Sequence, residues 1–308
     1  MHTVAVAGVR LPLSCLALGS TLFAKSSEEQ AFEMLDLFVA RGGNTFDTAH
    51  IYSGGASERA LGRWIAARGN RDQVVVIDKG CHPVGGSGPR VTPEDIHSDI
   101  ADSLERLQTS YIDLYLLHRD NEHVPVGPLV EALNDEHKQG RIHAFGGSNW
   151  SHLRIAEANA YAVEHGLIGF AASSPNLSLA RPKEPMWLGC VSLTQEARDW
   201  HMRTQLPVVS WSSQAGGFFT GRYSREETSN ADMVRVYYSE ENFQRLERSR
   251  QLADQKGVAA LQIALAWVLN QPFPVVALIG PQTPAELESS LAASGIRLTP
   301  EEQAFLDG

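Results

Sequence analysis

Four side chains of complementary chemistry stand close to the ends of short apolar runs in this sequence. Asp47, Lys79 and His118 each lie at the end of such a run, and Tyr52 follows Asp47 in the next loop. A carboxylate beside a lysine keeps the ammonium charged, and the ammonium favours the phenolate of a nearby tyrosine, whose pKa is normally about 10. We therefore expect the pKa of Tyr52 to be lowered and Tyr52 to act as a general acid. Taken singly, each residue also fits an ordinary structural role, such as a turn cap or a solvated strand end.

These side chains can meet only if the apolar runs are strands of one sheet. Short apolar or β-branched runs alternate along the chain with longer segments whose apolar residues recur at helical spacing. We predict eight strands, over Cys15–Gly19, Thr45–Thr48, Val74–Lys79, Ile112–His118, His143–Ser148, Gly169–Ser173, Pro207–Ser212 and Val275–Gly280.

Helix starts follow several of these strands. We expect a capping box at Ser26–Glu29, and Thr92 and Thr283 each precede a proline and an acid, which is typical of a helix N-terminus. The alternation continues to the end without a linker, which predicts a closed (β/α)8 TIM barrel, one domain over residues 1–308. The alternative is an open doubly wound sheet, but no G-x-G-x-x-G follows the first strand. Because the carboxyl ends of barrel strands face one mouth, the four side chains should converge on one rim.

Composition narrows the class of protein. With 43% hydrophobic and 20% charged residues the chain can bury a sizeable core, and its formal charge of −10 offers no general attraction to nucleic acid or to anionic membranes. The three cysteines Cys15, Cys81 and Cys190 are an odd number and do not suggest a disulfide framework, and we expect neither a secretory leader nor a membrane-spanning helix. We expect a cytoplasmic protein whose partner is a small molecule.

The four residues also carry a family resemblance. The stretch Gly43–Ala49, then Tyr52, then Ser57–Gly62 resembles the first signature of the aldo-keto reductases, and Tyr111–His118 is similar to the fourth-strand motif of that family. The order Asp47, Tyr52, Lys79, His118 matches the catalytic tetrad of that family. The resemblance spans essentially the whole chain.

The resemblance implies a barrel in which a nicotinamide cofactor delivers hydride to an aldehyde or ketone. In that scheme Tyr52 protonates the developing alkoxide, Lys79 and Asp47 tune the tyrosine, and His118 orients the carbonyl. Relatives that reduce carbon–carbon double bonds in steroids carry an acid in place of His118, so carbonyl reduction is favoured.

The resemblance also places the cofactor. It implies that Ser148 and Asn149 bind the nicotinamide carboxamide, that Trp211 stacks on the ring, and that Ser212 contacts the pyrophosphate. The segment around Gly216 and Gly217, with Arg222, is similar to the family's pyrophosphate loop.

Three departures from the family pattern concern the same cofactor. The sixth strand lacks the usual glutamine, for which Ser173 or Ser174 would substitute. After Gly280, Gln282 and Glu286 stand where relatives that bind NADP place basic residues, and Ser290 replaces an asparagine at the adenine end. A carboxylate at that place repels a 2′-phosphate and can instead accept a hydrogen bond from a ribose hydroxyl. The cofactor is therefore expected to be NADP(H) or NAD(H). The family resemblance favours NADP(H), whereas the residues Gln282 and Glu286 favour NAD(H).

The substrate pocket is expected to be walled by loops after several strands. The candidates are Phe23, Arg119 and Trp187, together with Asp120, Asn121 and His50. If Arg119 and Asp120 face the pocket rather than form a surface ion pair, a polyhydroxylated, sugar-like or acidic carbonyl compound suits it better than a steroid.

Other classes of function compete with a reductase. A barrel of this family could bind the nucleotide as a sensor or channel-associated subunit with little turnover. A hydrolase or lyase using a carboxylate pair has little support, because Asp47 is accounted for by Lys79. No metal site is predicted, since His118, Asp120 and His123 lack a compelling ligand arrangement.

Overall fold

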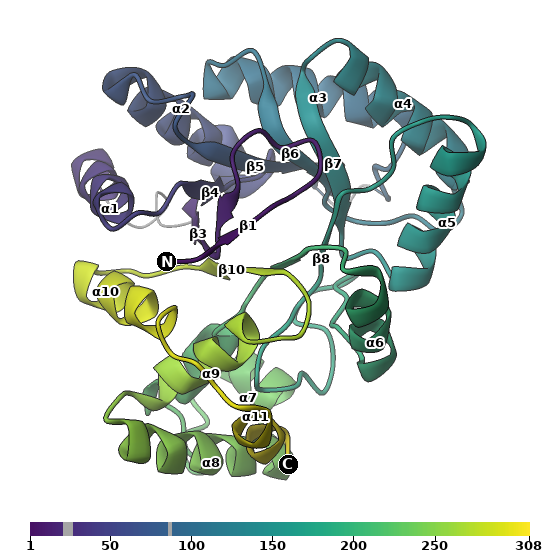
Figure 1. Cartoon of the computed structure of the whole chain (residues 1–308). Helices are drawn as coiled ribbons and strands as arrows, with labels where there is room; N and C mark the ends of the chain where they lie inside the picture. The colour runs from purple at the N-terminus through teal and green to yellow at the C-terminus, as the bar shows by residue number, and fades with distance from the viewer. Residues whose placement is uncertain (21–26, 86–87) are drawn as a thin grey trace.

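The computed structural model describes residues 1–20, 27–85 and 88–308 and contains a closed barrel of parallel strands (Figure 1). Around the barrel the strands follow the order β10-β3-β4-β5-β6-β7-β8-β9. They are β3 (Leu16–Gly19), β4 (Thr45–Asp47), β5 (Val75–Gly80), β6 (Ile112–Leu117), β7 (Ile142–Ser148), β8 (Ala172–Ser174), β9 (Val208–Ser210) and β10 (Val275–Ile279). The predicted (β/α)8 fold and all eight strands are confirmed.

The predicted sixth strand begins too early. It was expected from Gly169, whereas β8 begins at Ala172. Asn159 explains the difference, because its side chain accepts a hydrogen bond from the Phe170 N–H at 2.6 Å and donates to the Phe170 carbonyl at 3.3 Å. The backbone of Phe170 is therefore bonded to a helix side chain instead of to a neighbouring strand.

Helices surround the strands (Figure 1). They are α1 (Glu28–Ala40), α2 (Ala56–Arg68), α3 (Pro93–Leu107), α4 (Val126–Lys138), α5 (His152–Glu164), α6 (Gln195–Thr204), α7 (Ala231–Tyr237), α8 (Glu240–Lys256), α9 (Ala260–Leu269), α10 (Pro284–Ala293) and α11 (Pro300–Asp307), with the short 3-10 segments η2 (Tyr52–Gly55) and η3 (Ala215–Thr220). No helix within the described ranges combines the length and the apolar character needed to cross a membrane.

Two of the three predicted helix starts are confirmed. Thr92 and Thr283 cap α3 and α10, each accepting from a backbone N–H at 3.2 Å, with proline at the first turn. The first helix is capped by Ser27, which forms a capping box with Gln30. The expected cap, Ser26, lies outside the described residues. Helix α1 begins at Glu28 because the capping box is formed by Ser27 and Gln30.

A hairpin that the sequence analysis did not predict fills the floor of the barrel. β1 (Thr3–Val4) pairs antiparallel with β2 (Leu13–Ser14) ahead of the first barrel strand. Val4, Val6 and Leu13 pack with the inward-facing apolar residues of the barrel in one buried cluster. The barrel interior is therefore filled at this end, which leaves the carboxyl ends of the strands for a binding site.

The strand register decides which polar side chains point inward. Ile77 belongs to the inner cluster, so Lys79, two residues further along β5, lies on the inward face. Leu116 also belongs to the inner cluster, so His118, two residues further along, faces inward. Phe46 packs on the outward face, so its neighbour Asp47 faces inward. Alternation along three adjacent strands thus brings these polar groups to one mouth.

Candidate active site

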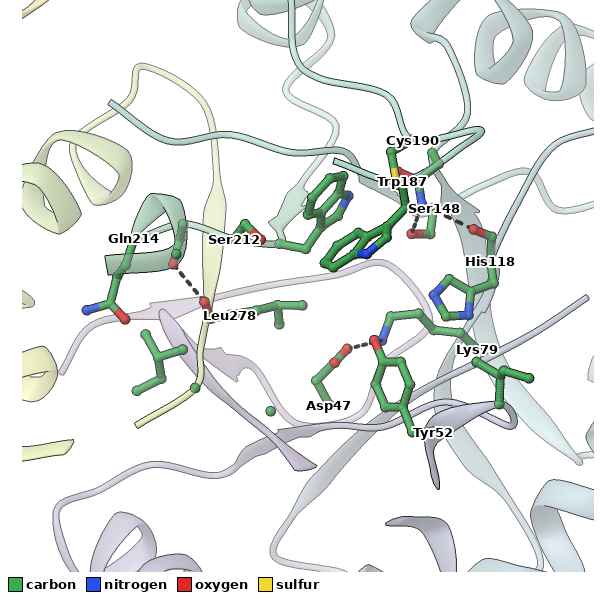
Figure 2. Close-up of a pocket in the computed structure, with 18 of the residues that line it drawn as sticks. Asp47, Tyr52, Lys79, His118, Ser148, Trp187, Cys190, Ser212, Gln214 and Leu278 are labelled. Carbon is green, nitrogen blue, oxygen red and sulfur yellow. Dashed lines mark hydrogen bonds and ion pairs between the residues drawn. The ribbon is translucent and has the colours of Figure 1, made fainter. Parts of the chain in front are cut away.

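A cavity of about 1180 Å³ opens at the carboxyl ends of the strands (Figure 2). It extends from the β4, β5 and β6 side of the barrel, which holds the tetrad, to η3 and the N-terminus of α10. Many residues expected to form the site line it: Asp47, Tyr52, Lys79, His118, Arg119, Asp120, Ser148, Asn149, Trp187, Trp211, Ser212, Gly216, Gly217, Arg222, Gly280, Gln282, Glu286 and Ser290.

Lys79 is the centre of the polar cluster at the mouth. Its Nζ lies 2.6 Å from Asp47 Oδ1, 2.9 Å from the Thr48 carbonyl and 3.4 Å from the Tyr52 hydroxyl (Figure 2). The side chains of Lys79 and Asp47 are only 2% and 4% exposed. A buried ion pair of this kind is held by its mutual attraction and hydrogen bonds, so the ammonium is fixed beneath the phenol.

Burial and neighbouring charges shift the pKa values of Lys79 and Asp47 in opposite directions. Burial alone would lower the pKa of Lys79, but Asp47 and Tyr52 together raise it above its usual value, which keeps the lysine cationic. Burial raises the pKa of Asp47, and Lys79 opposes that shift.

The expected lowering of the Tyr52 pKa is wrong. Desolvation of the phenol is the largest influence, and it raises the pKa above the usual value even though Lys79 works in the opposite direction. Part of the Tyr52 side chain reaches the surface, but the hydroxyl lies within the polar cluster. Tyr52 consequently holds its proton at neutral pH, which is the state that a proton donor needs.

The His118 imidazole stands beside Tyr52, and the His82 imidazole stands beside His118. The His118 ring lies edge-on to Tyr52, with centroids 5.8 Å apart, and the His82 ring lies 4.9 Å from His118. Burial lowers the pKa of His118 well below its usual value, and the charges of Lys79 and Arg119 lower it further. A neutral imidazole in this position can donate a hydrogen bond to a carbonyl oxygen.

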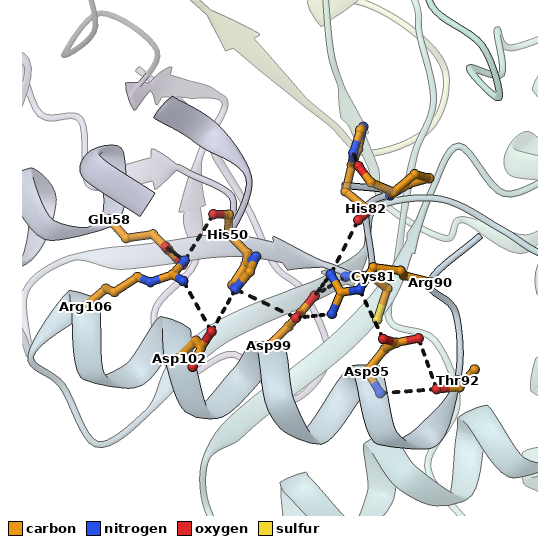
Figure 3. A network of polar contacts seen from close by, with 11 residues as sticks. His50, Glu58, Cys81, His82, Arg90, Thr92, Asp95, Asp99, Asp102 and Arg106 are labelled. Atoms are coloured by element: carbon orange, nitrogen blue, oxygen red, sulfur yellow. Dashed lines mark hydrogen bonds and ion pairs between the residues drawn. The ribbon is translucent and has the colours of Figure 1, made fainter. Parts of the chain in front are cut away.

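A polar network behind the cavity holds the loop that carries Tyr52 (Figure 3). Arg106, on α3, donates to the His50 carbonyl at 3.1 Å and to Glu58 Oε2 at 2.9 Å, and Glu58 is fully buried. His50 also donates its backbone N–H to the Lys79 carbonyl at 2.8 Å and places its ring 3.1 Å from Asp102. The backbone before Tyr52 is therefore tied to both α3 and β5.

The same network holds the chain after Lys79. Asp99, a buried carboxylate of α3, accepts from the Cys81 N–H at 2.7 Å and pairs with Arg90 at 2.7 Å (Figure 3). Cys81 has a left-handed backbone with φ of 62°, a conformation that costs a non-glycine residue energy. Asp99 stabilises that turn, and the turn begins two residues after Lys79.

The opposite side of the cavity, here termed the nucleotide side, is lined by Ser212, Gly216, Gly217, Arg222 and Glu286 and has the character of a phosphate site. Ser212, Ala215, Gly216 and Gly217 all have positive φ, between 47° and 85°. Turns of this kind can present backbone N–H groups to an anion. Arg222 lies nearby, 3.4 Å from Glu286, whose other carboxylate oxygen accepts from the Gln282 N–H at 2.7 Å.

Residues expected at the nicotinamide divide into two groups. Ser148 donates to the Ser174 carbonyl at 3.1 Å, and Asn149 Nδ2 donates to the His118 carbonyl at 3.2 Å, so both are oriented by the protein. Ser173 lies on the outward face of β8 and does not line the cavity, because inward Ala172 sets the register. Ser174 is the inward residue, and its buried hydroxyl has no hydrogen-bond partner within the described structure, but Ser174 is not among the residues that line the cavity either.

The expected substrate residues are dispersed. Arg119, Asp120 and Trp187 line the cavity, whereas Asn121 does not and His50 belongs to the network behind it. Phe23 lies outside the described residues.

A surface ion pair between Arg119 and Asp120 is not formed. Asp120 instead pairs with Arg154 at 3.3 Å. Arg119 Nη1 donates to the His118 carbonyl at 2.8 Å. The two neighbours therefore have separate roles, which the sequence alone did not show.

Several residues that line the cavity were not predicted from the sequence. His82 follows Lys79 in the loop after β5. Its place just after a barrel strand was the one sequence feature that could have indicated a cavity residue. Gln214 lies close to the nucleotide side and donates to Ser290 Oγ at 3.1 Å. Leu188 and Cys190 come from a long irregular segment between β8 and α6, for which no periodicity gave a signal.

The cavity fits an extended dinucleotide on physical grounds. It runs between the two sides of the mouth, it has a left-handed glycine turn at one side, and the buried Trp211 Nε1 has no hydrogen-bond partner in the described part of the chain. The ring centroids of Trp211 and Trp187 lie 6.0 Å apart in the lining of the cavity, so apolar ring surface is available for a flat group.

Comparison with known proteins agrees with this geometry. The chain is 30% identical over 305 residues to an uncharacterized oxidoreductase, YrpG, of Bacillus subtilis, covering 94% of this chain and 90% of the relative. It is 32% identical over 301 residues to norsolorinic acid reductase B of Aspergillus parasiticus, covering 91% and 74%. The glycerol dehydrogenase structure from Gluconobacter oxydans has the same fold, with a TM-score of 0.78 at 22% identity over 99% of this chain and 94% of that one. Residues 15–308 match the sequence profile of the Aldo/keto reductase family, and the chain belongs to that family.

Proposed function

We propose that this oxidoreductase reduces an aldehyde or ketone to an alcohol, with Tyr52 as the proton donor. The observation that carries the proposal is the buried cluster in which Lys79 contacts both Asp47 and the Tyr52 hydroxyl. The neutral His118 ring beside Tyr52 supplies a second donor for the same carbonyl oxygen.

Each residue has a separate task in this scheme. Tyr52 gives its proton to the oxygen as negative charge develops there, and cationic Lys79 stabilises the phenolate that remains. Asp47 keeps Lys79 charged and fixed in place. His118 orients the carbonyl before the proton moves, and burial keeps that imidazole neutral.

A nicotinamide nucleotide, NADP(H) or NAD(H), supplies the hydride when bound. Ser148, Asn149 and inward Ser174 would hold its carboxamide, and Trp211 would provide the stacking surface. The turn from Ser212 to Gly217 would hold the pyrophosphate. Arg222 would be the cation available to a 2′-phosphate, but Glu286 already pairs with it, so NADH should be used comparably to NADPH or better.

Substitution of Tyr52 by Phe tests the proposal. Turnover, followed as loss of reduced-cofactor absorbance on mixing with a panel of aldehydes, should fall by about 10²- to 10⁴-fold in Tyr52→Phe. Cofactor affinity should hardly change. Tyr161→Phe is the matched control, because that hydroxyl donates to Glu131 on the outer helices. Near-normal turnover in Tyr52→Phe would rule out Tyr52 as the donor.

The alternative, a nucleotide-binding sensor or channel-associated subunit, predicts a different result in the same assay. The wild-type protein would bind reduced cofactor with no consumption on addition of any aldehyde. Consumption at enzymatic rates by the wild type, lost in Tyr52→Phe, excludes that alternative.

A further inference from the structure

Within the part of the chain that the structure describes, one cation that lines the cavity lacks a carboxylate partner. Among the ionised side chains of the lining, Lys79 pairs with Asp47 and Arg222 pairs with Glu286. Asp120 pairs with Arg154, which leaves Arg119 as the one lining cation without an acidic partner in the described ranges. The segments 21–26 and 86–87 contain no acidic residue that could pair with it.

Arg119 is also held in place. Its Nη1 donates to the His118 carbonyl at 2.8 Å, and its own carbonyl accepts from the buried Trp150 Nε1 at 3.0 Å. A Cβ built on Gly189 would lie 3.3 Å from the Arg119 Cδ, so the aliphatic part packs closely against that loop. The guanidinium is thus ordered by the protein, with further N–H groups left for another acceptor.

The guanidinium charge acts on the reaction side of the cavity. It contributes to the lowered pKa values of His118 and His82, and it opposes the raised pKa of Tyr52. These influences agree with its place immediately after the β6 residue His118.

The cofactor is not the natural partner of this cation. In the barrel order, β6 lies four strands from β10 and therefore across the mouth from Gly280 and Gln282. Under the proposed function, the glycine turn and Arg222 would meet the phosphates of the cofactor on that far side. An anion at Arg119 therefore belongs to the substrate.

We propose that Arg119 binds a carboxylate of the carbonyl substrate, which makes the preferred substrate an oxo acid or an aldehyde that carries an acid group. A planar guanidinium matches a carboxylate in shape, and one positive charge balances one negative charge, whereas a phosphate dianion would call for a second cation. This inference rests on the proposed function of the same site and deepens it by naming the substrate class.

A matched pair of aldehydes tests the proposal. We expect wild-type kcat/KM to be higher for 4-formylbenzoate than for its methyl ester, which keeps the ring and the carbonyl but lacks the charge. Arg119→Gln should lower the acid-to-ester ratio of kcat/KM by about 10- to 100-fold, the usual effect of losing a charge-assisted hydrogen bond. Arg119→Lys should keep part of the preference, and added salt should reduce it.

Arg203→Gln is the control for a general loss of one positive charge. Arg203 lies exposed on α6 and does not line the cavity, so both substrates should react as in the wild type. Equal losses for acid and ester in Arg119→Gln, or an unchanged ratio, would overturn the assignment.

A binding measurement separates this inference from the proposed function. Calorimetric titration with 4-formylbenzoate in the absence of reduced cofactor reports the site without turnover. If no aldehyde is consumed but binding of the acid depends on Arg119, the reductase proposal fails and the carboxylate site stands. If aldehydes are reduced but the acid binds Arg119→Gln as well as wild type, or binds neither protein, the carboxylate site is wrong and the reductase proposal stands.

Discussion

The two sides of the cavity hold ion pairs of opposite character. On the tetrad side, Lys79 and Asp47 are 2.6 Å apart, with side chains 2% and 4% exposed. On the nucleotide side, Arg222 and Glu286 are 3.4 Å apart, with side chains 69% and 41% exposed. The first pair belongs to a connected polar network on buried strands, whereas the second joins an exposed segment to the N-terminus of α10.

The difference fits the task that the proposed function gives to each side. Charges that stabilise a transition state act best when they are fixed in advance and shielded from water. Charges that meet the phosphates of an incoming nucleotide must be free to exchange one partner for another, and an exposed pair loses little when it does so. Substitutions on the tetrad side should therefore change turnover or the free energy of unfolding strongly, whereas equivalent substitutions on the nucleotide side should change them little.

Lys79→Met should give the largest effect. Turnover should fall by about 10²- to 10⁴-fold, because the phenolate loses its counter-charge. The free energy of unfolding should also fall by about 3–5 kcal/mol, since Asp47 is left buried and unpaired. Single-turnover kinetics and urea unfolding measure the two effects.

The double variant Lys79→Met with Asp47→Leu separates those effects. Replacing a whole buried pair by apolar side chains removes the unpaired charge, so stability should recover while turnover does not. Recovery of turnover with stability would mean that Lys79 serves structure rather than chemistry.

Arg106→Met should have the next largest effect, on stability. It leaves fully buried Glu58 without its cation and removes the bond to the His50 carbonyl. We expect a loss of about 3–5 kcal/mol in the free energy of unfolding. Arg222→Met is the comparison variant, with an expected loss below about 1 kcal/mol. Similar losses in both variants would contradict the contrast between the two sides.

The pH dependence of stability should depend in part on His118. Its pKa in the folded protein is well below 6.5, so on acidification the unfolded chain takes up that proton first and stability falls below about pH 6.5. At pH 5.5 this loss is at most about 1.4 kcal/mol. His118→Gln should unfold with a smaller difference between pH 7.5 and 5.5 than wild type. If urea unfolding shows the same change in stability between pH 7.5 and 5.5 for both proteins, protonation of His118 does not contribute to the pH dependence of folding.

Glu286→Gln should have the smallest effect. Freed from its acid, Arg222 can meet a 2′-phosphate, which should raise the NADPH-to-NADH ratio of kcat/KM by up to about fivefold, as expected for an exposed pair. Glu288→Gln is the matched control on the same helix, since Glu288 pairs with Arg41 at 2.7 Å. A wild-type preference for NADPH of several hundredfold would show that Glu286 does not govern the choice.

Much of the fold was open to prediction from the sequence because its signals are local. Apolar runs and the caps at Thr92 and Thr283 depend on residues only a few positions apart, and they placed the eight strands. The position of Lys79 at a strand end came from the same signals, since alternation along a strand is a local property. The Ser26 cap was misplaced by one residue because Ser26 and Ser27 offer the same chemistry.

Tertiary structure alone decided the environment of each side chain. The pairing of Asp120 with Arg154 joins residues on different elements, and no spacing in the sequence indicates it. Which of Ser173 and Ser174 faces the barrel interior depended on the register of β8 against its neighbours. The pKa of Tyr52 was misjudged for the same reason: the sequence shows which charges stand near the phenol, but desolvation comes from the whole barrel that encloses it, and here it outweighs Lys79.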